Sequence, residues 1–192
     1  MPNVVEPSLR VNRGPAAGPE NRRALIAAAR EVYAEAGLSA PFSQVAKRAG
    51  VGQGSLYRHF PDRTALAVAV FEENIADLEA FASDPANTVD DFLDLVADQA
   101  VVSTAFIELV TADPADPRVH HIGARYRETV ELLLERQPAS TSGEPHFDVD
   151  DVLVATEMVA VVISRTPTEG RAAVAARARR LVHNAFRATD SR

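Results

Sequence analysis

Apolar residues recur every three or four positions along most of this chain, which is the spacing of one face of an α-helix. In the N-terminal part, each such run is bounded by residues that start or stop helices. We predict helices over 19–37, 43–50 and about 53–59, and a longer one that starts at Pro61. Ser43 is expected to cap the second helix at its N-terminus, and Gly50 is expected to end it.

The same periodicity continues towards the C-terminus. Thr88 and Asp91 resemble a capping box, which predicts a long helix whose apolar stripe runs from Phe92 to Val110. The other predicted features are a turn at 112–117 followed by a helix, a flexible linker at 137–147, and helices over 152–164 and about 168–187. No segment has the alternation of a strand, so we predict an all-α protein.

Residues 42–66 have the spacing of a helix-turn-helix. Ala46 is small enough for a second helix to cross closely over the first, and Gly50 can adopt the left-handed backbone that a tight turn needs. Leu56 would fill the space between the two helices. The polar residues of 53–59 are then left on an exposed helix, which is the element that commonly reads the major groove of DNA.

The charges of the chain are unevenly distributed. The 192 residues carry a net charge of −7, with eight Lys/Arg against four Asp/Glu in residues 1–60 and twelve against twenty-three in residues 61–192. A basic end on an acidic body is expected where only one end contacts nucleic acid. The lack of cysteine excludes disulfides and thiolate metal sites, and no apolar run reaches the roughly 18 residues of a membrane span. We therefore expect a cytoplasmic protein with no membrane contact, metal or cofactor.

Residues 21–82 resemble the N-terminal domain of the TetR family of bacterial transcriptional regulators. The matching segments are VYAEAG (32–37), VAKRAGV (45–51) and GSLYRHFPDRTAL (54–66), followed by a long helix. Two positions depart from the family pattern, because Phe42 stands where a serine or threonine is common and Arg63 stands where lysine is usual.

The resemblance implies a three-helix, helix-turn-helix DNA-binding head that a long fourth helix joins to a helical body for ligand binding and dimerisation. The expected division is a flexible basic arm at 1–18, a DNA-binding domain at 19–62 and the body at 63–192.

The resemblance also implies a set of DNA contacts. Gln53, Ser55 and Arg58 are the expected base readers, because glutamine can pair with adenine and arginine with guanine. Gly54 would let the helix backbone approach the groove. Residues expected to contact phosphates or attract DNA electrostatically are Ser43, Lys47, Tyr57, His59 and Arg63. Two alternatives stay open: Lys47 as a plain surface charge, and a Tyr57 ring that is partly core. The predicted partner is a double-stranded DNA operator.

A homodimer is expected from the apolar segment 152–164. A helix that is apolar almost all the way round must be buried on every side, so one side can pack on its own core while the other needs a partner subunit. The alternative is an ordinary central helix of a monomer. The predicted interface residues are Val152, Thr156, Val159, Ile163, Ala172, Ala176, Leu181 and Ala185.

A small-molecule effector is also expected. Glu157 is the only charge in the segment 152–164, and if buried it needs a partner, either an arginine or a cationic ligand. The third alternative is a partly exposed position at the rim. Aromatic and polar residues on several predicted helices suit a pocket for a lipophilic molecule, although each is also an ordinary core residue. These candidates are Phe92, Gln99, Phe106, Tyr126, Glu157 and Met158.

Together these patterns favour a transcriptional regulator, and the resemblance favours a repressor that a small lipophilic ligand releases from its operator. A constitutive DNA binder and a helical protein–protein adaptor that has lost DNA binding are the alternatives. An enzyme is not expected, because the chain has no Gly-rich phosphate loop, no GxSxG and no HExxH motif.

Overall fold

The computed structural model describes residues 18–36, 40–104, 107–108, 115–136 and 147–188. Every regular element among them is helical, which confirms the all-α prediction. The elements are α1 (Gly18–Ala36), α2 (Phe42–Arg48), α3 (Gln53–His59), α4 (Arg63–Ser83), α5 (Val89–Val102), α7 (Pro117–Leu134), α8 (Val149–Ser164), a 3-10 turn (Thr168–Gly170) and α9 (Arg171–Ala188). The predicted basic arm and nearly all of the predicted linker lie outside the described residues.

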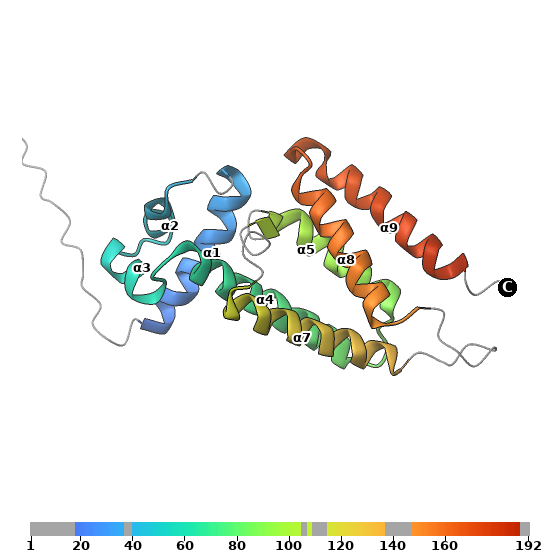
Figure 1. Cartoon of the computed structure of the whole chain (residues 1–192). Coiled ribbons are helices and arrows are strands. Elements are labelled where there is room, and N and C mark those ends of the chain that lie inside the picture. The colour runs from blue at the N-terminus through green and yellow to red at the C-terminus, as the bar shows by residue number, and fades with distance from the viewer. Residues whose placement is uncertain (1–17, 37–39, 105–106, 109–114, 137–146, 189–192) are drawn as a thin grey trace, which may run out of the picture.

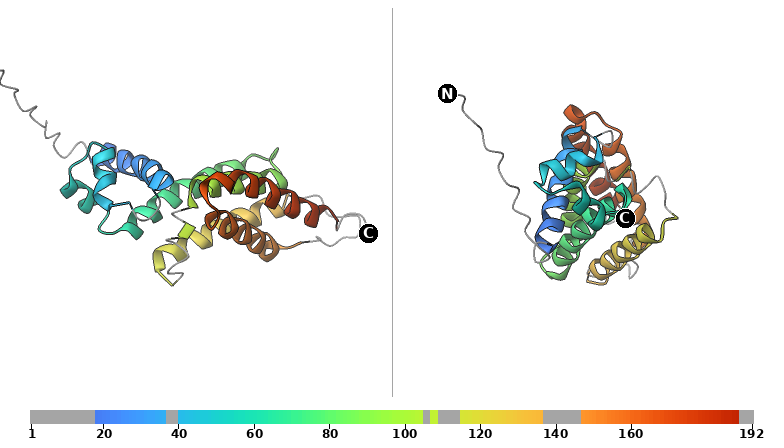
Figure 2. Two further views of the ribbon diagram at one scale, coloured as in Figure 1. Left: turned by 90° about the horizontal axis from the view of Figure 1, so that it is seen from above. Right: turned by 90° about the vertical axis from the view of Figure 1, so that its left-hand side faces the viewer.

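Two parts can be distinguished along the molecule. Helices α1, α2 and α3 gather at one end with the first turns of α4, and we call this part the head (Figure 1). The remainder of α4 lies along α7, while α5 packs on α8 and α9; these elements form the body. Seen from above, the head and the α5–α8–α9 group lie at opposite ends of the molecule (Figure 2). Among the described residues, no helix is both long and apolar enough to cross a membrane.

Local signals explain the head. Gly50 has a φ of 67°, so it takes the left-handed conformation expected at the end of α2. The Asp62 side chain accepts a hydrogen bond from the Ala65 backbone at 2.6 Å and thereby caps α4, which begins at Arg63, two residues after the predicted start at Pro61. The prediction for Ser43 is wrong: α2 begins one residue earlier, Pro41 occupies the N-cap position, and no side chain caps this helix.

The head has its own compact core. Leu25, Val32, Val45, Leu56 and Leu66 are completely buried, and they come from all four of its helices. Each helix is too short or too polar to be stable alone, so this shared burial holds the helices together. The predicted role of Leu56 is confirmed, since it is the one fully buried side chain of α3.

The body helices start at strong caps. Thr88 and Asp91 form the predicted capping box, in which the Thr88 hydroxyl accepts from the Asp91 backbone and the Asp91 carboxylate accepts from the Thr88 backbone. The Thr88 hydroxyl also donates to the Asp91 carboxylate at 2.6 Å, and this bond, together with the one from the Thr88 backbone, lowers the pKa of Asp91 below its ordinary value. Asp148 and Asp151 form a second capping box at the start of α8.

The long helix predicted to continue to Val110 is interrupted. α5 ends at Val102, and Ser103 follows it with a non-helical backbone. The Ser103 hydroxyl is buried and accepts a hydrogen bond of 3.2 Å from the Asn74 side chain of α4. Gln99 and Ser103 interrupt the apolar stripe, but the sequence could not show that the helix ends there, because the partner that holds Ser103 lies on another helix.

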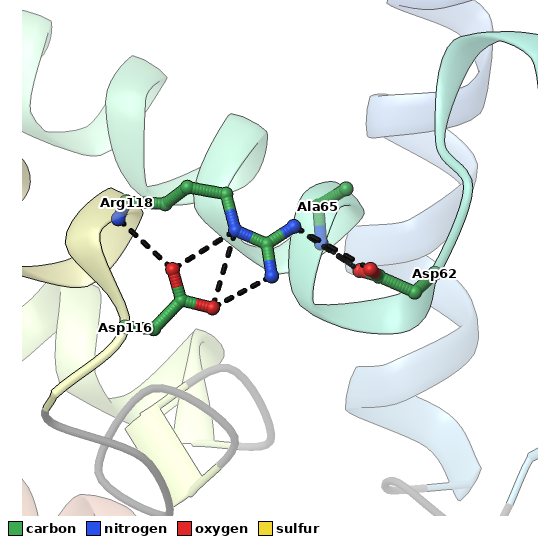
Figure 3. Close-up of polar contacts among 4 residues, drawn as sticks. All are labelled: Asp62, Ala65, Asp116 and Arg118. Carbon is green, nitrogen blue, oxygen red and sulfur yellow. Dashed lines mark hydrogen bonds and ion pairs between the residues drawn. The ribbon is translucent and has the colours of Figure 1, made fainter.

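Contacts from several helices join the head to the body. Phe71 of α4 packs against the core of the head and against both apolar clusters of the body. Arg30 of α1 donates a 2.8 Å hydrogen bond to the Asn74 side chain and lies 3.3 Å from Glu73. Arg118 of α7 is held by Asp116 and reaches the α4 cap Asp62 at 3.4 Å (Figure 3). The body therefore contacts the head close to the end of α3.

Candidate DNA-binding helix and ligand cavity

Helix α3 presents its polar side chains outward. Gln53 and Arg58 are exposed and Ser55 is half-buried, whereas Leu56 is locked in the core of the head. The Arg58 guanidinium donates to the Gly54 carbonyl at 3.1 Å, within its own helix. A hydrogen bond to the own backbone is easily exchanged for one to a base edge, so the three predicted base readers remain available to a partner.

Neither a steric contact nor the backbone conformation inside the protein requires glycine at position 54. A Cβ added at this position would meet no atom within 4 Å, and its backbone is an ordinary helical one. Glycine in a short helix lowers helix stability by about 0.5–1 kcal/mol relative to alanine. A requirement for close approach from outside the protein would account for it, as predicted for a helix in a groove.

The sequence left open whether Tyr57 is an exposed phosphate contact or has a ring that is partly core, and its position combines the two. Its ring is 53% exposed, and one edge packs on Phe42 with the ring centroids 5.5 Å apart and the planes at 76°. Phe42, which departs from the family pattern, therefore orients Tyr57 and joins α2 to α3. His59 is half-buried beside Phe60, whose ring also carries the Arg22 guanidinium at 5.5 Å.

The polar and basic residues of the head differ in how far hydrogen bonds and ion pairs within the chain already engage them. Lys47 is exposed, and Ser43 is half-buried in the first turn of α2. Arg63 is half-buried and donates to the Ala40 carbonyl at 2.8 Å, so part of its donor capacity holds the segment before α2. Arg48 is neutralised by Glu31 and Glu35 of α1 at 2.9 and 2.7 Å, and its hydrogen bond lowers the pKa of Glu35.

The body contains a cavity of about 460 Å³ among α4, α5, α7 and α8. Its walls are mostly apolar and include Phe71 of α4 and Ile122 of α7. Of the predicted ligand residues, Gln99, Tyr126 and Glu157 line it. Phe92 is completely buried behind Tyr126, on which it stacks with centroids 5.8 Å apart.

The remaining ligand predictions are corrected or fall outside the description. Met158 is 64% exposed and does not line the cavity, because it lies on the outer side of α8. Glu157 is exposed, so the expectation of a buried carboxylate is wrong. Phe106 lies outside the described residues. The cavity residues Asn74 and Ser103 were missed, and only the interruptions of the apolar stripes at these positions signalled them.

Four predicted interface residues of α8 face the chain's own interior. Val152, Thr156, Val159 and Ile163 are buried within this chain, so they cannot form a surface for a partner. The opposite side of α8 exposes Val154, Met158 and Val162, and α9 exposes Leu181 at 65%. Ala172 and Ala185 of α9 are exposed as well, and Ala176 is half-buried. We name the exposed side chains Val154, Met158, Val162 and Leu181 the outer apolar face.

Comparison with known proteins agrees with this arrangement. Residues 25–70 match the family described as bacterial regulatory proteins, tetR family. The TetR transcriptional regulator SCO0520 from Streptomyces coelicolor is 25% identical, covers 88% of this chain and 97% of its own, and has a TM-score of 0.60. A TetR transcription regulatory protein from Mycobacterium vanbaalenii is 27% identical, with 78% and 95% covered and a TM-score of 0.56. No curated protein sequence gives a match.

A third solved structure is similar in fold. It is LfrR from Mycobacterium smegmatis in complex with proflavine, which is 22% identical, with 87% and 96% covered and a TM-score of 0.57. The chain thus has the fold of an all-helical transcriptional regulator with an N-terminal helix-turn-helix. Residues 25–70 are thus similar to the TetR family, and the whole chain has the fold of solved TetR regulators.

Proposed function

We propose that this protein is a homodimeric repressor that binds a DNA operator through α3 and is released by a small lipophilic molecule bound in the body. The DNA-binding part of this proposal rests on one observation, which is that α3 has one side buried in the head and one side exposed. Its single fully buried side chain, Leu56, fixes the helix on the head, while Gln53 and Arg58 point away from any core. A helix held in this way can enter a major groove without losing its packing.

Dimerisation is supported by the outer apolar face. Exposed apolar side chains at i, i+4 and i+8 of α8, next to Leu181 of α9, form a continuous surface that monomeric proteins seldom expose. Pairing two copies through these helices would set two α3 helices at a fixed distance. Two half-sites about 34–36 Å apart are the usual requirement for tight binding by helix-turn-helix dimers.

Ligand release is supported by the connection between the cavity and the head. Phe71 and Asn74 line the cavity, and both also contact the head, Phe71 through its core and Asn74 through Arg30 of α1. A ligand in the cavity that shifts these side chains would change the position of the head relative to the body. The solved structure of LfrR, a regulator of similar fold, in complex with proflavine supports this part of the proposal. A coupling of about 1–3 kcal/mol is enough for a usable switch.

The DNA-binding proposal is tested by selecting duplexes from a random pool and measuring their affinity by fluorescence anisotropy. If six to ten phosphates are contacted, affinity should fall by about 10³–10⁵ between 50 and 200 mM salt. Arg58→Ala should lose about 1–3 kcal/mol of discrimination at one base pair. Arg127→Ala, which removes an exposed arginine of the body, serves as the matched control. Failure to enrich any sequence, or equal effects of the two variants, would contradict the proposal.

A further inference from the structure

Three polar residues of the cavity wall adjoin one another. Asn74 donates to the Ser103 hydroxyl at 3.2 Å, and Gln99 donates to the Asn74 backbone carbonyl at 3.4 Å. All three residues line the cavity, whose wall also includes apolar side chains such as Ile122 and Leu153. We call this group, which α4 and the end of α5 form together, the polar end of the cavity.

This polar end retains hydrogen-bonding capacity that no described residue uses. The Ser103 oxygen accepts from Asn74, which leaves the hydroxyl proton free to donate. The Gln99 side chain donates through its amide nitrogen, and its carbonyl oxygen is engaged by no described residue. By contrast, the Asn74 amide is used on both sides, by Arg30 and by Ser103. One donor and one acceptor thus face the cavity at this end.

No charge is available there to balance an ionic ligand. Arg30 lies behind Asn74 and is already paired with Glu73 at 3.3 Å. The two charged residues of the cavity wall, Arg127 and Glu157, are exposed, and Arg127 pairs with Asp150 at 2.6 Å. An ammonium or carboxylate placed at the polar end would lose its hydration without gaining a counter-ion, which strongly disfavours binding.

Tyr126 shapes the cavity without serving this polar end. Its ring lines the wall, but its hydroxyl is buried and has no hydrogen-bond partner among the described residues. Thr156, next to it, uses its own hydroxyl on the carbonyls of Val152 and Leu153. Burial raises the pKa of Tyr126, so this residue is a neutral aromatic surface at any physiological pH.

We infer that the cavity selects an uncharged, mostly apolar molecule with one hydroxyl or carbonyl group, which Ser103 and Gln99 bind at the polar end. This assignment rests on the proposed function, in that it names the chemical class of the releasing molecule. It makes Ser103 and Gln99 specificity-determining residues. It also places the ligand's polar group one hydrogen bond from Asn74, the side chain that holds Arg30 of the head.

The experiment is a displacement assay with the full chain and no DNA. The neutral dye N-phenyl-1-naphthylamine is bound first and then displaced by 1-octanol, octylamine or octanoate, which share one alkyl chain and differ in the charge of the head group. At pH 7 we expect 1-octanol to displace the dye at a concentration about a hundredfold or more below that of either ion. Equal or better displacement by octylamine or octanoate would overturn the inference, as would failure of the dye to bind.

Variants locate the polar contact. Ser103→Ala and Gln99→Leu should each raise the 1-octanol concentration needed about three- to tenfold, because each removes one neutral hydrogen bond. Thr156→Val is the matched control, since Thr156 lines the same cavity outside the polar end and its hydroxyl donates to the Val152 and Leu153 carbonyls. If Ser103→Ala does not fold, Gln99→Leu carries the test alone. Unchanged displacement in the folded variants would overturn the assignment of the polar end, while DNA binding, measured separately, would still stand or fall by itself.

Discussion

The head and the body are both built from helices, but the head has a filled core and the body encloses a cavity. In the head, α1, the short helices α2 and α3 and the start of α4 enclose a core in which Leu25, Val45 and Leu56 are completely buried. In the body, α4, α5, α7 and α8 leave a cavity of about 460 Å³, and polar residues interrupt the apolar stripes where they line it. The comparison teaches that one helical chain can keep a rigid surface at one end and a space for another molecule at the other.

The two parts also differ in how they expose apolar surface. α3 of the head shows polar side chains outward, which suits a partner that carries charge and hydrogen-bonding groups. α8 of the body shows Val154, Met158 and Val162, which suit a partner of the same apolar kind. Phe71 contacts all three apolar clusters, so a change in one part has a direct route to the other.

The largest effect is expected when a buried side chain in the core of the head is shortened. Leu56→Ala should lower the free energy of unfolding by about 2–5 kcal/mol, because a fully buried leucine leaves a cavity. Urea denaturation followed by circular dichroism measures this. Gln53→Ala on the exposed side of α3 is the control and should change stability by at most about 0.5 kcal/mol while weakening operator binding. A small effect of Leu56→Ala would mean that the core of the head is not tightly packed.

The outer apolar face predicts the next largest effect. Val154→Asp places a charge on the surface that we propose to be covered by a second copy, and it should weaken the dimer by about 3 kcal/mol or more. Sedimentation velocity over a range of protein concentrations measures the change. Ala76→Asp adds the same charge at an exposed position of α4 outside this face. If both variants sediment alike, or the native chain is monomeric, the dimer proposal is wrong.

The connection between the two parts can be tested at α1. Arg30→Met removes the hydrogen bond to Asn74 and the pair with Glu73, whereas Arg22→Met removes a 3.6 Å contact to Glu72 and the stacking on Phe60 but no contact with Asn74. In the native protein, saturating 1-octanol should weaken operator binding by about 5- to 150-fold, the range of typical couplings. Arg30→Met should bring this ratio close to one, and Arg22→Met should leave it unchanged. Equal ratios in both variants would show that coupling does not pass through Arg30.

The smallest effect concerns the ion pair that holds α7 on α4. Arg125 donates two hydrogen bonds to Glu79, at 2.8 and 2.7 Å, and they lower the pKa of Glu79. Because the pKa is depressed in the folded state, the stabilisation is present above the ordinary carboxyl pKa and is lost as pH falls through the lowered value. Arg125→Gln should cost about 0.2–1 kcal/mol at pH 7, since the pair is partly exposed.

Denaturation at several pH values measures this prediction. The difference between Arg125→Gln and the native chain should shrink as the solution is acidified from pH 5 to pH 3, because Glu79 becomes protonated in both. Glu79→Gln is the control, and it should reproduce the loss at pH 7 and abolish any further loss from Arg125→Gln. A difference that persists in acid would assign the effect to packing of the arginine stem instead.

Sequence patterns predicted the head better than the body. Gly50 and the Thr88–Asp91 capping box act on neighbouring residues, so their roles were visible in the chain and the structure confirms them. The interruption after Val102 was not visible, because Ser103 is held by Asn74 of another helix. The pairing of Arg48 with two glutamates of α1 was not visible either, because it depends on how α2 packs on α1.

The sequence by itself determined that the chain is helical, that it begins with a helix-turn-helix, and which residues of α3 stay outside, because periodicity, caps and glycine act over a few residues. Only the tertiary structure decided which side of α8 is free and where the cavity lies. A helix that is apolar all round gives no sign of which side its own chain covers, so Val152 and Val154 are equivalent until the other helices are in place. Burial and enclosed space arise from several helices together, and no single segment encodes them.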